Sequence, residues 1–142
     1  MPNQTLTETN KELARRYIKE VWDQHNANLV DEFFAADAVR TDPATGVERG
    51  RDAIKQVATA LLAAFPDIRF TIELQTAEDD SVVTRWSCAG THLGDFQGIA
   101  PTGKQFTNRG SSTYRYADGL IVEENTFWDA LGLLRTIGVV QV

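Results

Sequence analysis

The sequence predicts an α+β domain in which helices cover one face of a curved antiparallel sheet. Apolar residues recur at helical spacing as far as Phe65, whereas from Ile68 onward they alternate with polar residues, as in half-buried strands. A run of helices followed by a run of strands is typical of this class, because the apolar face of the sheet needs a cover. A chain of 142 residues, 42% of them hydrophobic, fits one domain over residues 1–142 with a single core.

The first predicted helix begins near Thr9. Thr9 and Glu12 have the spacing of a capping box, in which each side chain bonds a free backbone N–H of the other residue. Apolar side chains then follow at helical spacing, at Leu13, Tyr17 and Val21. This stripe predicts a helix that buries one face against the sheet.

Two further helices are expected before the strands. The first is short, with Asn28 as its cap, and its inward-facing residues are expected to be Leu29, Phe33 and Phe34. Residues 44–50 have the glycine and polar content of a loop. Residues 51–65 form an amphipathic pattern that Pro66 ends, which predicts the third helix.

Four meandering strands are expected after this helix. In the first, the side chains that share the buried face are expected to be Ile68, Phe70, Ile72 and Leu74. Residues 78–80 form a turn and residues 82–91 the second strand. Residues 112–116 and 120–128 form a hairpin around Asp118-Gly119, a pair that favours a tight turn. A helix of period 3.6 follows, with an apolar stripe of Leu131, Leu134 and Ile137.

The turn length decides which side chains of the hairpin share a face. A three-residue loop pairs Arg115 with Ile121 and places odd-numbered residues on the face of Asp129. A two-residue turn brings Ser112 and Tyr114 there instead. The sequence leaves both alternatives open.

Charge and composition exclude several classes of partner. The net charge of −6 argues against nucleic acid and against an anionic membrane as partners, because both require a basic face. Cys88 is the single cysteine, which excludes an internal disulfide bond. The N-terminal segment is polar, and no apolar run is long enough to span a bilayer. A cytoplasmic location is therefore expected.

Cofactor and metal motifs are absent from the sequence. There is no G-x-G-x-x-G, P-loop, C-x-x-C pair or G-x-S-x-G elbow. With His25, His92 and one cysteine, neither a zinc site nor a Cys-His nucleophile is expected. We therefore expect no cofactor and no metal, and any catalysis would rest on a carboxylate or a histidine that moves protons.

Three segments carry a family resemblance. GTHLGDFQGIAPTGKQF (90–106), YRYADGLIVE (114–123) and WDALGLLRTIG (128–138) resemble the SnoaL-like polyketide cyclases, which belong to the nuclear transport factor 2-like superfamily. The resemblance implies a cystatin-like cone, in which the curved sheet wraps around the N-terminal helices and leaves a central pocket. It also implies a homodimer formed through the outer face of the sheet, and a small hydrophobic, carbonyl-containing ligand.

The same resemblance implies an intramolecular aldol reaction with Asp129 as general base and then acid. Burial beside Phe127 and Trp128 would make this carboxylate a stronger base. Asp129 also directly precedes a short helix, where Asp is a favoured N-cap, and one residue could do both. His92, at the end of a strand, is a candidate proton partner, although it could equally hold the following loop.

Other side chains are candidates for contacting the substrate. They are Tyr17, Trp86, Phe96, Arg115, Asn125 and Phe127. Three of them have a structural alternative: Tyr17 and Phe96 as core aromatics, and Arg115 with Glu123 as a solvated cross-strand ion pair.

Two departures from the family pattern affect the expected substrate. Thr41 stands where members often have histidine, and the wall around Asn125 and Thr126 lacks their usual aromatic and acidic residues. Three functions therefore stay open: a cofactor-free cyclase or ketosteroid isomerase-like enzyme, an epoxide hydrolase, which needs an Asp-Arg-Asp arrangement around a water, and a non-catalytic ligand-binding or dimerisation module. An exposed Asp129 bonded only to backbone amides would favour the third.

Overall fold

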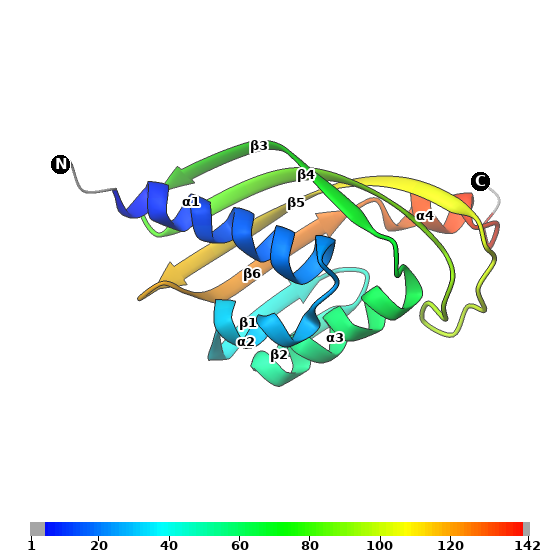
Figure 1. The fold of residues 1–142 in the computed structure, drawn as a ribbon, viewed down its shortest axis with the longest axis horizontal. Helices are drawn as coiled ribbons and strands as arrows, with labels where there is room; N and C mark the ends of the chain where they lie inside the picture. The colour runs from blue at the N-terminus through cyan, green and yellow to red at the C-terminus, as the bar shows by residue number, and fades with distance from the viewer. Residues whose placement is uncertain (1–4, 141–142) are drawn as a thin grey trace.

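The computed structural model describes residues 5–140 and has the predicted α+β architecture (Figure 1). One six-stranded sheet, in the order β2-β1-β6-β5-β4-β3, curves around the helices without closing. Helix α1 (Leu6–Tyr17) packs on β3 and β4, and α3 (Arg51–Ala64) packs on β1 and β2. Helix α4 (Ala130–Thr136) lies at the end of the sheet near β5. Within residues 5–140 no helix is long and apolar enough to cross a membrane.

The N-cap of helix α1 lies four residues earlier than predicted. Thr5 is the N-cap, and its Oγ1 accepts a hydrogen bond from the Glu8 N–H at 3.2 Å. The prediction of Thr9 was wrong because Thr5 and Glu8 repeat the spacing of Thr9 and Glu12, and the first pair takes the role. The helix continues as a π-helical segment, Ile18–Asp23.

The second helix is shorter than expected. A 3₁₀ turn, Ala27–Leu29, leads into the single turn of α2, Val30–Phe33. Asn28 lies inside the 3₁₀ turn and is not a cap, and Phe34 begins a strand instead of ending the helix. The helix predicted over residues 51–65 is confirmed as α3.

Two strands were missed by the sequence prediction. β1 (Phe34–Asp42) and β2 (Gly46–Arg49) form a hairpin, and β1 runs parallel to β6, so the sheet is mixed. The missed strand β1 buries Arg40 and Asp42, and it therefore lacks the hydrophobic alternation that marks a strand. The four predicted strands correspond to β3 (Arg69–Glu78), β4 (Ser81–Thr91), β5 (Gln105–Ala117) and β6 (Leu120–Trp128).

Two irregularities decide which side chains point inward. A bulge between Ile72 and Leu74 on β3 turns Leu74 outward, where it is 51% exposed, so its predicted burial was wrong. Asp118 and Gly119 form a two-residue turn with φ of 51° and 80°. A second bulge, at Val122 of β6, follows this turn. As a result, the buried polar residues of this hairpin include Ser112, Glu124 and Thr126.

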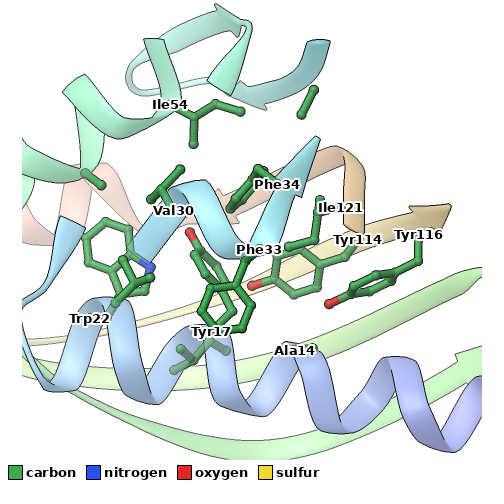
Figure 2. Close-up of a cluster of buried hydrophobic side chains, with 14 of the residues drawn as sticks. Ala14, Tyr17, Trp22, Val30, Phe33, Phe34, Ile54, Tyr114, Tyr116 and Ile121 are labelled. Carbon is green, nitrogen blue, oxygen red and sulfur yellow. The ribbon is translucent and has the colours of Figure 1, made fainter. Parts of the chain in front are cut away.

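The core has two clusters. In the first, the Tyr17 ring meets those of Phe33, Phe34 and Tyr114 edge-on, at centroid distances of 5.8, 5.1 and 5.9 Å (Figure 2). The second cluster centres on Phe65 and is covered by Leu133 of α4. Residues of both clusters line one cavity.

Candidate active site

The cavity lies under the helices on the inner face of the sheet and holds about 670 Å³ of empty space, part of it open to solvent. Most of its wall is apolar, which suits a hydrophobic ligand. The apolar and aromatic lining residues are Ile18, Trp22, Leu61, Phe65, Ile68, Phe70, Trp86, Cys88, Phe106, Tyr114, Trp128 and Leu133. The polar part of the wall comes from β1, β5 and β6, at Arg40, Asp42, Asn108, Ser112, Glu124 and Thr126.

Arg40 is the centre of this polar wall. The residue is 4% exposed and lies between β2 and β6, directly opposite Glu48 on one side and Glu124 on the other. Its Nε is 3.4 Å from Glu124 Oε2, its Nη2 is 3.2 Å from Asp42 Oδ2, and its Nη1 is 3.7 Å from Glu48 Oε1. Burial alone would lower the pKa of Arg40, but the surrounding carboxylates hold that pKa above its usual value. The guanidinium therefore stays charged.

One guanidinium faces three carboxyl groups in this cluster. If all three were ionised, two negative charges would be uncompensated in a poorly solvated site, so a proton bound to one of them is favourable. Burial raises the pKa of Glu124, and the attraction of Arg40 and the hydrogen bond from Thr126 offset this only in part. Glu124 is therefore the carboxyl group of this cluster whose raised pKa suits it to exchange a proton with a ligand.

The two oxygens of Glu124 differ. Oε2 accepts a hydrogen bond from Thr126 Oγ1 at 2.5 Å and contacts Arg40 Nε. Oε1 is buried and has no hydrogen-bond partner among the described residues. A buried polar atom without a partner is rare in a folded protein and marks a place where a ligand group can bind.

Asp42 is, by contrast, fully bonded. Its carboxylate accepts hydrogen bonds from the Ala44 N–H at 2.8 Å, from Trp128 Nε1 at 3.0 and 3.2 Å, and from Arg40 Nη2 at 3.2 Å. Both oxygens of the carboxylate therefore have hydrogen-bond donors. Asp42 thus fixes Arg40 and Trp128 in place on the cavity wall.

Asp129, the predicted base, does not line the cavity. The residue is exposed, and its Oδ1 accepts the Gly132 N–H at 2.8 Å as the N-cap of α4. The expected burial beside Phe127 and Trp128 was wrong, because Phe127 is 60% exposed on the outer face. The helix-cap role is confirmed, and a catalytic role for Asp129 stays a prediction.

His92 is fully buried outside the cavity lining. Its Nδ1 accepts the Thr102 N–H at 3.2 Å, and its backbone bonds Gly103 and Lys104. These contacts hold the loop after β4, which is the structural alternative predicted for this residue. Phe96 packs in that loop against Phe65, at a centroid distance of 5.3 Å.

All eight predicted site residues fall within the described part of the chain, and among them Trp86 lines the cavity. Tyr17 is a buried core aromatic in the cluster of Figure 2. Arg115 and Glu123 form the cross-strand pair given as the alternative, 3.6 Å apart and half exposed, and Asn125 Nδ2 donates to Glu123 Oε1 at 3.2 Å. Leu74 and Phe127 are exposed on the same outer face of the sheet. Dimerisation through this face stays a prediction.

The sequence argument missed Arg40, Asp42 and Glu124. The sequence pattern did not reveal Glu124, because a two-residue turn alone would pair Ser112 with Asn125, and the bulge at Val122 makes Thr126 its cross-strand partner instead. Glu124, two residues before Thr126, shares the inner face only because of this bulge. Arg40 and Asp42 belong to the strand that the apolar pattern did not reveal.

Comparisons with known proteins agree with this architecture. The profile of the SnoaL-like polyketide cyclase family matches residues 12–137. A protein from Jannaschia sp. CCS1, assigned as a SnoaL-like polyketide cyclase, superposes with a TM-score of 0.89 at 21% identity, covering 99% of both chains. IdmH from Streptomyces antibioticus, assigned as a polyketide cyclase, superposes with a TM-score of 0.78 at 30% identity, over 92% of this chain and 99% of its own.

A third solved structure extends the fold comparison. A protein from Catenulispora acidiphila with a ketosteroid isomerase-like fold, in complex with trimethylamine, has a TM-score of 0.78 at 20% identity, over 91% of this chain and 94% of its own. No curated protein sequence matches. The predicted nuclear transport factor 2-like cone is thus confirmed. The chain belongs to the SnoaL-like polyketide cyclase family.

Proposed function

We propose that the protein is a cofactor-independent acid/base enzyme that removes a proton next to a carbonyl group of a small hydrophobic substrate, with Glu124 as the base. One observation carries this proposal: Glu124 Oε1 is buried on the wall of an apolar cavity, has no partner, and belongs to a carboxyl group with a raised pKa. A carboxylate with a raised pKa is a stronger base and works closer to neutral pH.

The proposed reaction is an intramolecular aldol closure. Ionised Glu124 takes a proton from a carbon between two carbonyl groups, and the electron pair of the broken C–H bond moves onto a carbonyl oxygen as an enolate. The enolate carbon attacks a second carbonyl carbon of the same molecule and forms a C–C bond. The resulting alkoxide oxygen takes the proton back from Glu124, which returns to its ionised form.

Arg40 has an electrostatic role in this proposal. Its guanidinium is buried and charged, and it lines the same cavity as Glu124. A fixed positive charge in a poorly solvated site stabilises the negative charge that develops on the substrate oxygen. Asp42 and Glu48 hold the guanidinium in a fixed position on the cavity wall.

A second candidate function is water addition to an epoxide. The observation that favours it is the position of Arg40 between the carboxyl groups of Asp42 and Glu124. In this reaction Glu124 Oε1 would take a proton from water while the water oxygen attacks an epoxide carbon. The epoxide C–O bond would break, Arg40 would stabilise the released oxygen, and that oxygen would take the proton back from Glu124.

Deuterium exchange tests the first function. The protein is incubated in D₂O with β-dicarbonyl compounds and aromatic polyketide esters, and NMR follows deuterium at the activated carbon. We expect exchange or cyclisation with the wild type and with the matched control Glu123→Gln, a carboxylate on the outer face of the same strand. We expect loss with Glu124→Gln, whose amide mimics the protonated side chain.

The other outcomes separate the alternatives. Exchange that survives in Glu124→Gln and is lost in Asp129→Asn would make Asp129 the base and overturn the assignment. No exchange with any compound, together with diol formation from epoxides that depends on Glu124, would favour the second function. Binding of these compounds without either reaction would favour a non-catalytic ligand-binding module. The exposed position of Asp129, taken alone, favours the same alternative.

A further inference from the structure

We propose that Thr126 and Ser112 are positioning residues that determine which oxygen of Glu124 handles the proton. This inference deepens the proposed function and rests on it, because it takes Glu124 as the base. It begins from a continuous hydrogen-bond chain that crosses three strands. Trp86 Nε1 lies 3.0 Å from Ser112 Oγ, Ser112 Oγ lies 2.9 Å from Thr126 Oγ1, and Thr126 Oγ1 lies 2.5 Å from Glu124 Oε2.

The chemistry of the groups gives this chain one direction. An indole N–H can only donate, so Ser112 Oγ is the acceptor of the first bond. Thr126 directs its single hydroxyl hydrogen to Glu124, and its oxygen therefore accepts from Ser112. Every donor in the chain points toward Glu124.

The direction distinguishes the two oxygens of Glu124. Oε2 receives the Thr126 hydroxyl and the Arg40 Nε, two donors that stabilise a negatively charged oxygen. Oε1 receives none among the described residues. The proton therefore binds to Oε1 and leaves from it, while Oε2 keeps its donors in both states.

The surrounding backbone is built for this chain. Ser112 and Thr126 are cross-strand partners, so their hydroxyl groups meet on the inner face. Trp86 lies opposite Gly110, where a Cβ atom would overlap the indole ring. The missing side chain lets the ring lie close against β5 and reach Ser112. All four side chains of this hydrogen-bond chain are buried, so water does not compete for these bonds.

Two NMR signals of the wild-type protein test the chain without any substrate: the ¹³C shift of the Glu124 carboxyl carbon and the ¹⁵N shift of the Trp86 indole, followed during a pH titration. We expect both to titrate with the same midpoint. In Thr126→Val, which keeps the shape of the side chain and removes the hydroxyl, the apparent pKa of Glu124 is expected to rise by about one unit or more, since a hydrogen bond to the charged form is lost. Thr126→Ser is expected to restore the wild-type value.

Ser112→Ala breaks the middle of the chain. In this variant Glu124 still titrates, but the response of the Trp86 ¹⁵N shift is expected to fall to less than half, because the hydrogen-bond path between the two side chains is broken. An electric field that acts through space would leave the response unchanged. The matched control is Thr113→Val, which removes a hydroxyl from the outer face of the same strand and is expected to change neither signal.

An unchanged Glu124 pKa in Thr126→Val, or a full response of the Trp86 ¹⁵N shift in Ser112→Ala, would overturn the proposal that this hydrogen-bond chain positions Glu124. These results are independent of the proposed function. If the chain is present and no substrate exchanges deuterium, the proposed function fails while the positioning geometry stands. If deuterium exchange depends on Glu124 but the variants change neither the Glu124 pKa nor the Trp86 response, only the positioning role of Thr126 and Ser112 fails.

Discussion

Arg40 of β1 and Glu124 of β6 face each other directly across the one parallel strand pair of the described sheet, with Arg40 Nε 3.4 Å from Glu124 Oε2. Both side chains are buried, and Asp42 and Glu48 complete the charge cluster around the guanidinium. The parallel pairing of β1 with β6 thus creates the polar wall of an otherwise apolar cavity. The following predictions test what this wall does.

Replacing Arg40 by Met is expected to cost about 3–5 kcal/mol of unfolding free energy, because removal of one partner leaves buried carboxylates uncompensated. The loss is expected to be smaller at pH 5 than at pH 8, since protonation removes the uncompensated charge. Urea unfolding at both pH values measures it. Arg115→Met is the control: it breaks a half-exposed pair and is expected to cost less than about 1 kcal/mol. Equal losses at the two positions would contradict the account.

The stability difference between Glu124→Gln and the wild type is expected to depend on pH. The folded-state pKa of Glu124 is raised, so its contribution to stability is complete below the ordinary value of 4.5 and is lost as pH rises through the folded-state pKa. The stability of Glu124→Gln relative to the wild type should therefore increase as pH rises from 4.5. Urea unfolding across this range measures the difference. A difference that shrinks with rising pH would mean that folding lowers this pKa.

Asp129→Ala is expected to lower the unfolding free energy by about 1 kcal/mol, because α4 loses its N-cap. Asp129→Asn keeps a capping oxygen and is expected to stay near the wild-type value. Chemical denaturation of the two variants separates the cap from any catalytic role, since Asn preserves the cap and abolishes the carboxylate. A similar loss in both variants would contradict the cap.

Gly110→Ala is expected to destabilise the protein by about 1–3 kcal/mol and to displace Trp86. The added Cβ would overlap both the indole ring and the carbonyl oxygen of Phe127, so the ring and the neighbouring backbone must shift. Denaturant unfolding and tryptophan fluorescence measure the two effects. Gly119→Ala is the control, because a Cβ at this turn position would meet no neighbouring atom. The tryptophan fluorescence of this variant is expected to stay unchanged. An unaltered Trp86 environment in Gly110→Ala would contradict the packing.

The fold was predictable wherever the sequence pattern reflects burial. The Asp118-Gly119 turn, the hairpin around it and helix α3 all follow from residue types that suit their backbone conformation. Strand β1 was not predictable in this way, because it buries Arg40 and Asp42. Their burial is favourable only through partners on β2 and β6, which are distant in sequence.

The site was less predictable than the fold. Asp129 was selected from a family resemblance, although its position before α4 already indicated a cap. Glu124 faces inward because a two-residue turn is combined with a bulge at Val122. The residue types around Val122 do not predict that bulge. Trp86 was found because strand β4 is regular and alternates strictly.

The pH dependence of deuterium exchange tests the central claim most directly. For the compound that exchanges fastest, kcat/KM is measured against pH in the wild type, Glu123→Gln and Asp129→Asn, and the Glu124 carboxyl pKa is measured by ¹³C NMR in the free protein. We predict that exchange falls as pH decreases through one midpoint, that this midpoint equals the Glu124 pKa and lies above the ordinary glutamate value, and that neither variant moves it. A midpoint that disagrees with the Glu124 pKa, or that disappears in Asp129→Asn, would contradict Glu124 as the base.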